Sequence, residues 1–124
     1  MINLDDRTDL FKAFSGALFT RDMEALYAVV TPDFVWSYHD GVSVTKAMAD
    51  RAAIAEHLAQ QKAVYAAQRF HEIAYHHLPD VAFMTFRISE TVRATGEVRE
   101  QRGIERYVIK DGRIATKDVY RKPI

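Results

Sequence analysis

The first part of the chain carries apolar side chains at helical spacing. Leu10, Phe14 and Leu18 lie four residues apart within residues 4–20, which predicts an amphipathic helix. Asn3 stands where a residue that caps the first turn is expected, because its side chain can accept a hydrogen bond from a free backbone amide.

Two further helices are predicted by the same spacing. Residues 23–30 follow Asp22 with apolar side chains on one face, and Thr31-Pro32 ends this short helix because the residue before a proline avoids the helical conformation. Asp50 caps a third helix that runs to about Tyr65.

The remaining chain alternates between apolar and polar residues, which predicts strands. Residues 34–39 form one strand, residues 42–49 fit neither pattern, and strands follow from residue 68 to the end. Helices and strands in separate blocks predict an α+β fold, with helices packed on one face of an antiparallel sheet. The turns are expected at Pro79-Asp80, Thr95-Gly96 and Asp111-Gly112.

Turn positions predict which side chains share a face of the sheet. A two-residue turn at Thr95-Gly96 places Glu90 opposite Gln101 and Phe86 opposite Glu105. The face that holds these residues and Met84 is the most apolar alternation in the chain, so we assign it to the interior.

A two-residue turn at Pro79-Asp80 adds another strand to the interior face. It places Arg69 opposite Glu90 and His71 opposite Ile88, with Tyr75 further along. This register brings a histidine and an arginine to the buried carboxylates.

The last strand allows two registers. A two-residue turn at Asp111-Gly112 turns Thr116, Asp118 and Tyr120 inward and makes a carboxylate pair of Asp118 and Glu105. A bulge at Gly112 instead turns Lys117, Val119 and Arg121 inward and makes a Lys117–Glu105 ion pair.

Composition narrows the function classes. The 124 residues are expected to form a single domain, residues 1–124, and Lys plus Arg equals Asp plus Glu at 17 each. A neutral chain has no general attraction for nucleic acid or acidic membranes, so neither is an expected partner. Cysteine is absent, which removes thiol chemistry. No apolar stretch is long enough for a membrane span and no signal peptide is evident, so we expect a cytoplasmic protein.

Two carboxylates on an apolar face point to a ligand cavity. Buried Glu90 and Glu105 are costly unless they are paired or wetted. Glu105 fits a general acid, and it fits a structural ion pair equally well. His71 fits a proton shuttle or a histidine satisfied within a polar strand. Neighbouring strand residues such as His76 and His77 point to opposite faces, so we expect no metal site.

The order of elements resembles the NTF2-like superfamily, also called SnoaL-like. The resemblance rests on Arg21-Asp-Met-Glu-Ala-Leu, Thr31-Pro-Asp-Phe-Val-Trp, Asp50-Arg-Ala-Ala-Ile-Ala and Lys110-Asp-Gly-Arg-Ile. It implies a cone-shaped (cystatin-like) fold, in which three N-terminal helices pack on a curved antiparallel sheet around a pocket. The superfamily holds isomerases, epoxide hydrolases, polyketide cyclases and non-catalytic modules, so the fold does not decide the activity.

The resemblance also compares single residues with known catalytic sites. In the isomerase pattern, Phe14 replaces the oxyanion tyrosine and Tyr38 replaces the general base, whereas Glu105 keeps the third, acidic position. In the epoxide-hydrolase pattern, Arg87 matches but the two aspartates fall on Ser89 and Val119. The residues therefore imply chemistry that differs from both groups, or none.

These observations together predict a pocket for a small cyclic or aromatic molecule. We expect a cofactor-independent isomerase, lyase or hydrolase, and the alternative is a non-catalytic ligand-binding or dimerisation module. The predicted catalytic residues are Glu105, His71 and Tyr38. The predicted ligand-binding residues are Phe14, Trp36, Arg69, Tyr75, Phe86, Ile88, Glu90, Tyr107 and Lys117.

The outer face of the sheet mixes arginine with aliphatic residues. This composition is more typical of a subunit contact than of bare solvent surface, and the resemblance implies a homodimer through the same face. The face is predicted to carry Arg87, Ser89, Thr91, Arg93, Arg102, Ile104, Arg106 and Val108.

Overall fold

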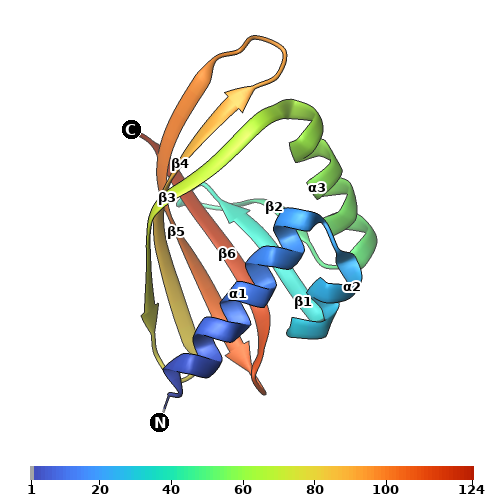
Figure 1. Cartoon of the computed structure of the whole chain (residues 1–124), viewed down its shortest axis with the longest axis vertical. Helices are drawn as coiled ribbons and strands as arrows, with labels where there is room; N and C mark the ends of the chain where they lie inside the picture. The colour runs from blue at the N-terminus through green and yellow to red at the C-terminus, as the bar shows by residue number, and fades with distance from the viewer. Residues whose placement is uncertain (1) are drawn as a thin grey trace.

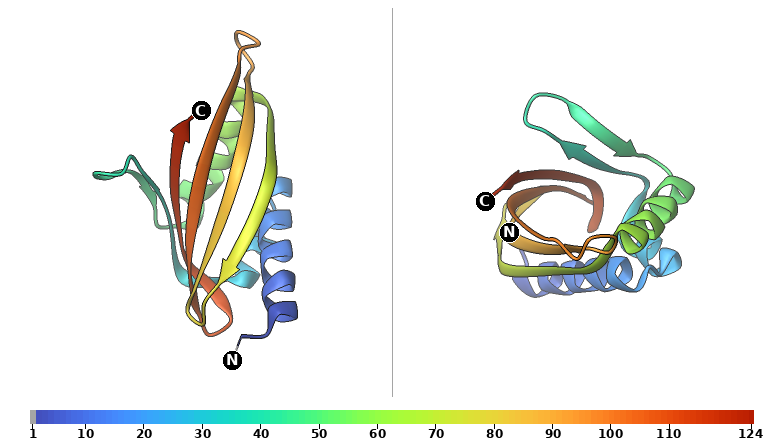
Figure 2. Two further views of the ribbon diagram at one scale, coloured as in Figure 1. Left: turned by 90° about the vertical axis from the view of Figure 1, so that its left-hand side faces the viewer. Right: turned by 90° about the horizontal axis from the view of Figure 1, so that it is seen from above.

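The computed structural model describes residues 2–124 and shows three helices against one strongly curved six-stranded sheet (Figure 1). Seen from above, the sheet curls around an interior and the helices lie along one side (Figure 2). The predicted α+β class is therefore confirmed, and the order of elements matches the prediction apart from the additional strand β2. The elements are α1 (Leu4–Thr20), α2 (Met23–Val29), β1 (Val30–His39), β2 (Val44–Met48), α3 (Arg51–Val64), β3 (Tyr65–His77), β4 (Val81–Val92), β5 (Val98–Lys110) and β6 (Arg113–Pro123).

Each helix begins at a side-chain cap. The Asn3 side chain accepts a hydrogen bond from the backbone amide of Asp6, and Asp22 caps α2 in the same way. Asp50 accepts from the amide of Ala53 at 2.8 Å. These caps satisfy amides that have no partner within the helix, and they confirm the predicted starting points.

The sheet order is β2-β1-β6-β5-β4-β3, and the last four strands form the predicted meander. Residues 42–49, which matched no pattern, contain β2, which pairs with β1 as an antiparallel hairpin. β1 also pairs with β6, and this pair is parallel. The parallel pair joins strands far apart in the sequence, so no turn signal predicts it.

The β4–β5 hairpin has a longer loop than predicted. The Val92 amide donates to the carbonyl of Glu97 at 2.8 Å, which leaves a four-residue loop, 93–96. Glu90 therefore lies opposite Arg99 rather than Gln101. Because the register moves by two residues, each side chain stays on its predicted face.

A bulge in β3 overturns part of the predicted register. Tyr75 lies opposite Met84 as expected, but the pairing shifts between His71 and Ala74, where Glu72 has a positive φ of 52°. A shift of one residue reverses the faces of the side chains before it, here back to a second shift between Tyr65 and Ala67.

This shift corrects the placement of two predicted site residues. His71 lies opposite Arg87 and Arg69 lies opposite Ser89, on the outer face rather than in the interior. Gln68 and Phe70 take their predicted positions, opposite Glu90 and Ile88.

β6 adopts the register with Lys117, Val119 and Arg121 inward, although the bulge is not where it was expected. Asp111 and Gly112, with φ of 52° and 74°, form a two-residue turn that pairs Lys110 with Arg113. The shift occurs at Ala115, so that Tyr107 lies opposite Lys117. The extra residue in the strand reverses the faces that the turn alone would give.

A buried apolar cluster lies between the helices and the interior face of the sheet. Phe14, Phe34, Leu26, Ile54 and Ile88 are among its most buried side chains, each at most 1% exposed. Phe14 comes from α1, Ile54 from α3 and Ile88 from β4. The cluster therefore packs α1 and α3 against the sheet.

Candidate functional site

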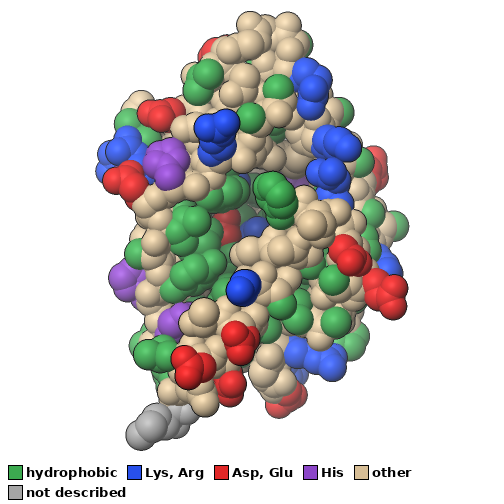
Figure 3. Space-filling view, viewed as in Figure 1, with side chains coloured by type: hydrophobic (Ala, Val, Ile, Leu, Met, Phe, Trp, Pro, Cys, Tyr) green, Lys and Arg blue, Asp and Glu red, His purple; other side chains and the backbone are tan. Residues whose placement is uncertain are grey.

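The face shown in Figure 3 has a hollow, and acidic and basic side chains are visible on its floor. Its position corresponds to the space between α1, α3 and the edge strand β3 in Figure 1. Apolar side chains surround the opening. The registers of β4, β5 and β6 turn several polar side chains toward this side of the sheet.

Glu105 stands at the centre of the first polar cluster. Its side chain is only 1% exposed, and the Tyr107 hydroxyl donates a hydrogen bond to its Oε1. Lys117 Nζ lies 3.7 Å from the same oxygen. The expected Lys117–Glu105 ion pair is therefore present, and it compensates a carboxylate that burial alone would disfavour.

Burial and Glu105 together control the protonation of these partners. Burial, followed by the negative charge of Glu105, raises the pKa of Tyr107 well above its usual value, so this phenol stays protonated and donates. Burial lowers the pKa of Lys117, and the neighbouring Glu105 carboxylate partly opposes that effect.

Aromatic rings enclose this cluster. Lys117 Nζ lies 4.1 Å from the centre of the Trp36 ring and 5.4 Å from that of Phe14. A buried ammonium gains from contact with ring faces. Phe11 of α1 packs against both Tyr75 and Tyr107, with 4.9 Å between ring centres in each case. Residues from α1, β1, β3 and β5 thus form one wall.

Glu90 forms a second polar cluster with residues from three elements. The Gln68 Nε2 donates to Glu90 Oε2 at 2.6 Å, and Arg121 Nη1 lies 3.5 Å from the same oxygen. Gln68 also donates to Gln61 of α3 at 3.1 Å. The Arg121 guanidinium lies 5.7 Å from the Phe86 ring centre. Glu90, like Glu105, is buried and paired with a cation.

A histidine that the sequence analysis did not single out links α3 to the pocket wall. His57 is 3% exposed, and its Nε2 lies 3.1 Å from the Tyr38 hydroxyl. Its Nδ1 lies 2.9 Å from Lys46 Nζ of β2. Burial, followed by the charge of Lys46, lowers the pKa of His57 to about 4. Burial likewise raises the pKa of Tyr38.

The spacing of α3 contained the signal for His57. His57 follows Ile54 by three residues and precedes Gln61 by four, so the three side chains share one face of the helix. Helical spacing from Ile54, which is fully buried, would therefore have pointed to His57.

The structure brings most of the predicted site residues together. Glu105, Tyr107, Lys117, Trp36 and Phe14 contact one another at the first cluster. Glu90 contacts Arg121, whose guanidinium faces the rings of Tyr38 and Phe86. Tyr75 joins the wall, and Ile88 is fully buried in the apolar cluster. Arg69 and His71 are exposed on the outer face and take no part.

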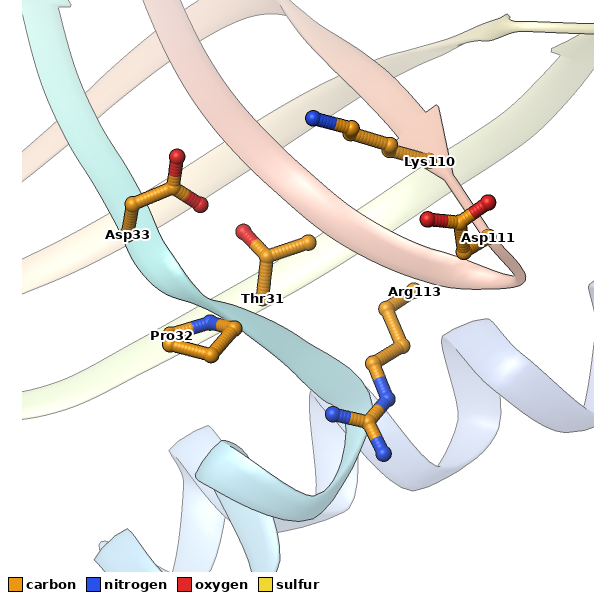
Figure 4. A pocket seen from close by; sticks show the side chains of 6 residues that line it. All are labelled: Thr31, Pro32, Asp33, Lys110, Asp111 and Arg113. Carbon is orange, nitrogen blue, oxygen red and sulfur yellow. The ribbon is translucent and has the colours of Figure 1, made fainter.

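Two further clefts are present. One, of about 370 Å³, has charged side chains of both signs and lies where the β5–β6 turn meets the start of β1 (Figure 4). The pKa of its carboxylate Asp33 is lowered, chiefly by the neighbouring Thr31 hydroxyl. The other, of about 430 Å³, includes Ile104 and Tyr120 of the outer face, and Phe86 and Arg121 of the Glu90 cluster also line it. Neither contains Glu105 or Glu90.

Residues 2–124 hold no group of three side chains suited to binding a metal ion. Within the same residues, no helix has both the length and the apolar character that crossing a membrane requires.

A sequence model of the SnoaL-like domain matches residues 11–117. No curated protein sequence matches the chain. Solved structures share its fold at low sequence identity. An NTF2-like protein from Burkholderia xenovorans LB400 is 16% identical, with a TM-score of 0.79 over 95% of this chain and 90% of that one.

Two other solved structures carry names that refer to small molecules. A candidate polyketide cyclase from Xanthomonas campestris pv. campestris is 17% identical, with a TM-score of 0.76 over 94% of this chain and 90% of that one. TerC, crystallised with polyporic acid, is 16% identical, with a TM-score of 0.74 over 92% of this chain and 89% of that one. At these identities the likeness establishes the fold.

Proposed function

Because this chain belongs to the SnoaL-like domain family, we propose that its hollow binds a small cyclic or aromatic molecule and that Glu105 transfers a proton on that molecule. The proposal needs no cofactor. Fold alone would not support it, since related folds host both enzymes and binding modules. The support comes from the geometry around Glu105.

One observation carries the proposal. The contacts of Tyr107 and Lys117 both fall on Oε1 of Glu105. Among residues 2–124, Oε2 has no hydrogen-bond partner. A carboxylate that is fixed through one oxygen and has the other available is suited to act as a general base or acid. An exclusively structural carboxylate would gain from using both oxygens.

The neighbouring groups suit the remaining parts of such a reaction. Removing a proton from carbon next to a carbonyl group leaves negative charge on oxygen, which a nearby cation stabilises. Lys117 carries that cation beside Glu105. Trp36, Phe14 and Phe86 supply flat apolar surface, and aromatic rings favour planar ligands. The names of TerC and of the candidate cyclase, which refer to such molecules, add support by analogy.

Binding is measurable without knowing the natural ligand. Trp36 is the only tryptophan of the chain, and it stands in the wall beneath Lys117. We expect polyporic acid or a panel of cyclic ketones and phenols to change Trp36 fluorescence. Catalysis is then tested by proton–deuterium exchange next to the carbonyl of each ketone that binds, followed by NMR in D₂O.

The decisive variant is Glu105→Gln. It should retain ligand binding and reduce the exchange rate by at least 100-fold, the usual range for loss of a general base. Glu97→Gln alters an exposed glutamate directly before β5. It serves as the matched control and should exchange at the unchanged rate. Exchange that persists in Glu105→Gln contradicts the role given to Glu105.

The second candidate function is ligand binding without catalysis. It is favoured by one specific observation: each buried carboxylate already has a cation partner, Lys117 for Glu105 and Arg121 for Glu90. Such pairs neutralise one another and need no reaction to explain them. Ligands that bind tightly while no member of the panel undergoes exchange would support this candidate over the enzyme.

A further inference from the structure

The hydrogen-bond chain through His57 has a fixed direction. Lys46 Nζ can only donate, so the His57 Nδ1 that lies 2.9 Å away must accept. The ring proton of the neutral imidazole then resides on Nε2, which donates to the Tyr38 hydroxyl oxygen at 3.1 Å. Burial keeps His57 neutral near pH 7, because its pKa is lowered to about 4.

In this arrangement the hydroxyl proton of Tyr38 has no hydrogen-bond acceptor among residues 2–124. The oxygen is the acceptor for His57, so the hydroxyl must donate its own proton elsewhere. A second donor lies on the same strand: Trp36 Nε1 is buried and has no hydrogen-bond partner within those residues. Trp36 and Tyr38 share the interior face, with 6.0 Å between stacked ring centres. Buried donors without acceptors are uncommon in folded proteins.

Cations surround this part of the hollow. Lys46, Lys117 and Arg121 each act on the His57 ring electrostatically, and the Arg121 guanidinium lies 5.8 Å from the Tyr38 ring centre. Glu90 and Glu105 balance Arg121 and Lys117. Lys46 has no carboxylate within ion-pair distance among the described residues. The two unused donors at this wall, the Tyr38 hydroxyl and Trp36 Nε1, hydrogen-bond most strongly to an acceptor oxygen that carries negative charge.

We propose that the Tyr38 hydroxyl binds an anionic or strongly polarised oxygen of the ligand, such as that of a phenolate or an enolate. Lys46 and His57 are positioning residues that orient the Tyr38 proton toward the ligand, and Trp36 Nε1 is a second donor at the same wall. This inference rests on the proposed ligand binding in the hollow but not on proton transfer by Glu105. It narrows the ligand class to acidic phenols and enols.

The test compares 4-nitrophenol with nitrobenzene, which has the same ring and lacks the hydroxyl oxygen. Calorimetric titration gives both affinities, and the absorbance of nitrophenol reports how much of it is bound as phenolate. For the unaltered protein we expect tighter binding of nitrophenol and ionisation of the bound phenol at a lower pH than in water. Tyr38→Phe should lower the affinity for nitrophenol at least tenfold and should change the affinity for nitrobenzene by less than twofold.

A matched control keeps this result specific. Tyr120→Phe makes the same change on the outer face, where Tyr120 stacks on His39, and should leave both affinities unchanged. Lys46→Met tests the positioning role. It should lower the affinity for nitrophenol and leave the affinity for nitrobenzene unchanged. It should also reduce the fraction of His57 that is protonated on Nε2, which nitrogen NMR of the ring measures.

The outcomes separate the two proposals. If both probes bind but Tyr38→Phe changes their affinities equally, Tyr38 does not bind the ligand oxygen, whereas the proposed function is unaffected. If Lys46→Met leaves the His57 tautomer unchanged, the positioning role is wrong. If neither probe binds at millimolar concentration, ligand binding in the hollow is contradicted, and the inference falls with it.

Discussion

Glu105 and Glu90 are buried among apolar side chains, and each has a cation and an uncharged donor as partners. Removing one member of such a group would leave a charge buried without compensation. The third interior group differs, because His57 is kept neutral instead of being paired. Its polar contacts orient a proton rather than balance a charge.

The state of His57 predicts how stability depends on pH. Its pKa is about 4 in the folded protein and about 6.5 in the unfolded chain. Between these values the unfolded chain binds a proton that the folded protein does not, so stability falls as pH decreases from about 6.5 to about 4. We expect this contribution to be on the order of 2 kcal/mol.

Urea unfolding followed by circular dichroism, from pH 7 to pH 4, measures this contribution. The variant His57→Gln should lose less stability than the unaltered protein over this range, and the difference gives the contribution of His57. His71→Gln alters an exposed histidine of the outer face and should retain the original pH dependence. Equal slopes for His57→Gln and the unaltered protein would show that the histidine already titrates normally.

Two bulges decide which side chains of β3 and β6 reach the interior. The shift beside Glu72 sends His71 outward, and the shift at Ala115 sends Lys117 inward. Strands with one extra residue bend more sharply as well as changing face. The bulges in β3 and β6 therefore contribute both to the curvature of the sheet and to the choice of side chains that line the hollow.

The close packing of β5 gives a prediction at the level of the element. A Cβ atom on Gly103 would lie 2.5 Å from Phe86 Cζ and 2.6 Å from the carbonyl oxygen of Tyr120. The second contact is backbone, which cannot move away without distorting β6. We expect Gly103→Ala to destabilise the protein by about 2 kcal/mol, measured by urea unfolding at pH 7.

Gly16→Ala is the matched control, since a Cβ there meets nothing within 4 Å. Gly16 lies within α1, where alanine is more favourable than glycine by up to about 1 kcal/mol. The two substitutions should therefore change stability in opposite directions. A neutral or stabilising Gly103→Ala would mean that the two strands separate easily at this point.

The outer face of the sheet gives a prediction for the whole molecule. Ile104 is 45% exposed and Tyr120 is 37% exposed, and both line the cleft of about 430 Å³ together with Arg102 and Lys122. Exposed apolar side chains among arginines are typical of subunit contacts. We therefore expect a homodimer through this face.

Light scattering coupled to size-exclusion chromatography tests the assembly. The unaltered protein should have twice the mass of the chain, and Ile104→Asp should shift it to the monomer because a charge would be buried at the contact. Val42→Asp, at the tip of the β1–β2 hairpin and 95% exposed, should leave the dimer intact. A monomeric unaltered protein would contradict the prediction outright.

The sequence by itself determined one face of the sheet and every element except β2. Helix caps at Asn3, Asp22 and Asp50 are local signals, since each needs only the next few residues. The alternation in β4 is equally local, and it placed Glu90 in the interior correctly even though the turn was misjudged. An error of two residues leaves a face unchanged.

Only the tertiary structure decided which polar groups meet in the hollow. The bulges at Glu72 and Ala115 depend on how neighbouring strands pair, and no local residue pattern required them. The contact of His57 with Tyr38 and Lys46 joins α3 to β1 and β2. Such contacts depend on packing between segments distant in the sequence, and periodicity within one segment carries no information about them.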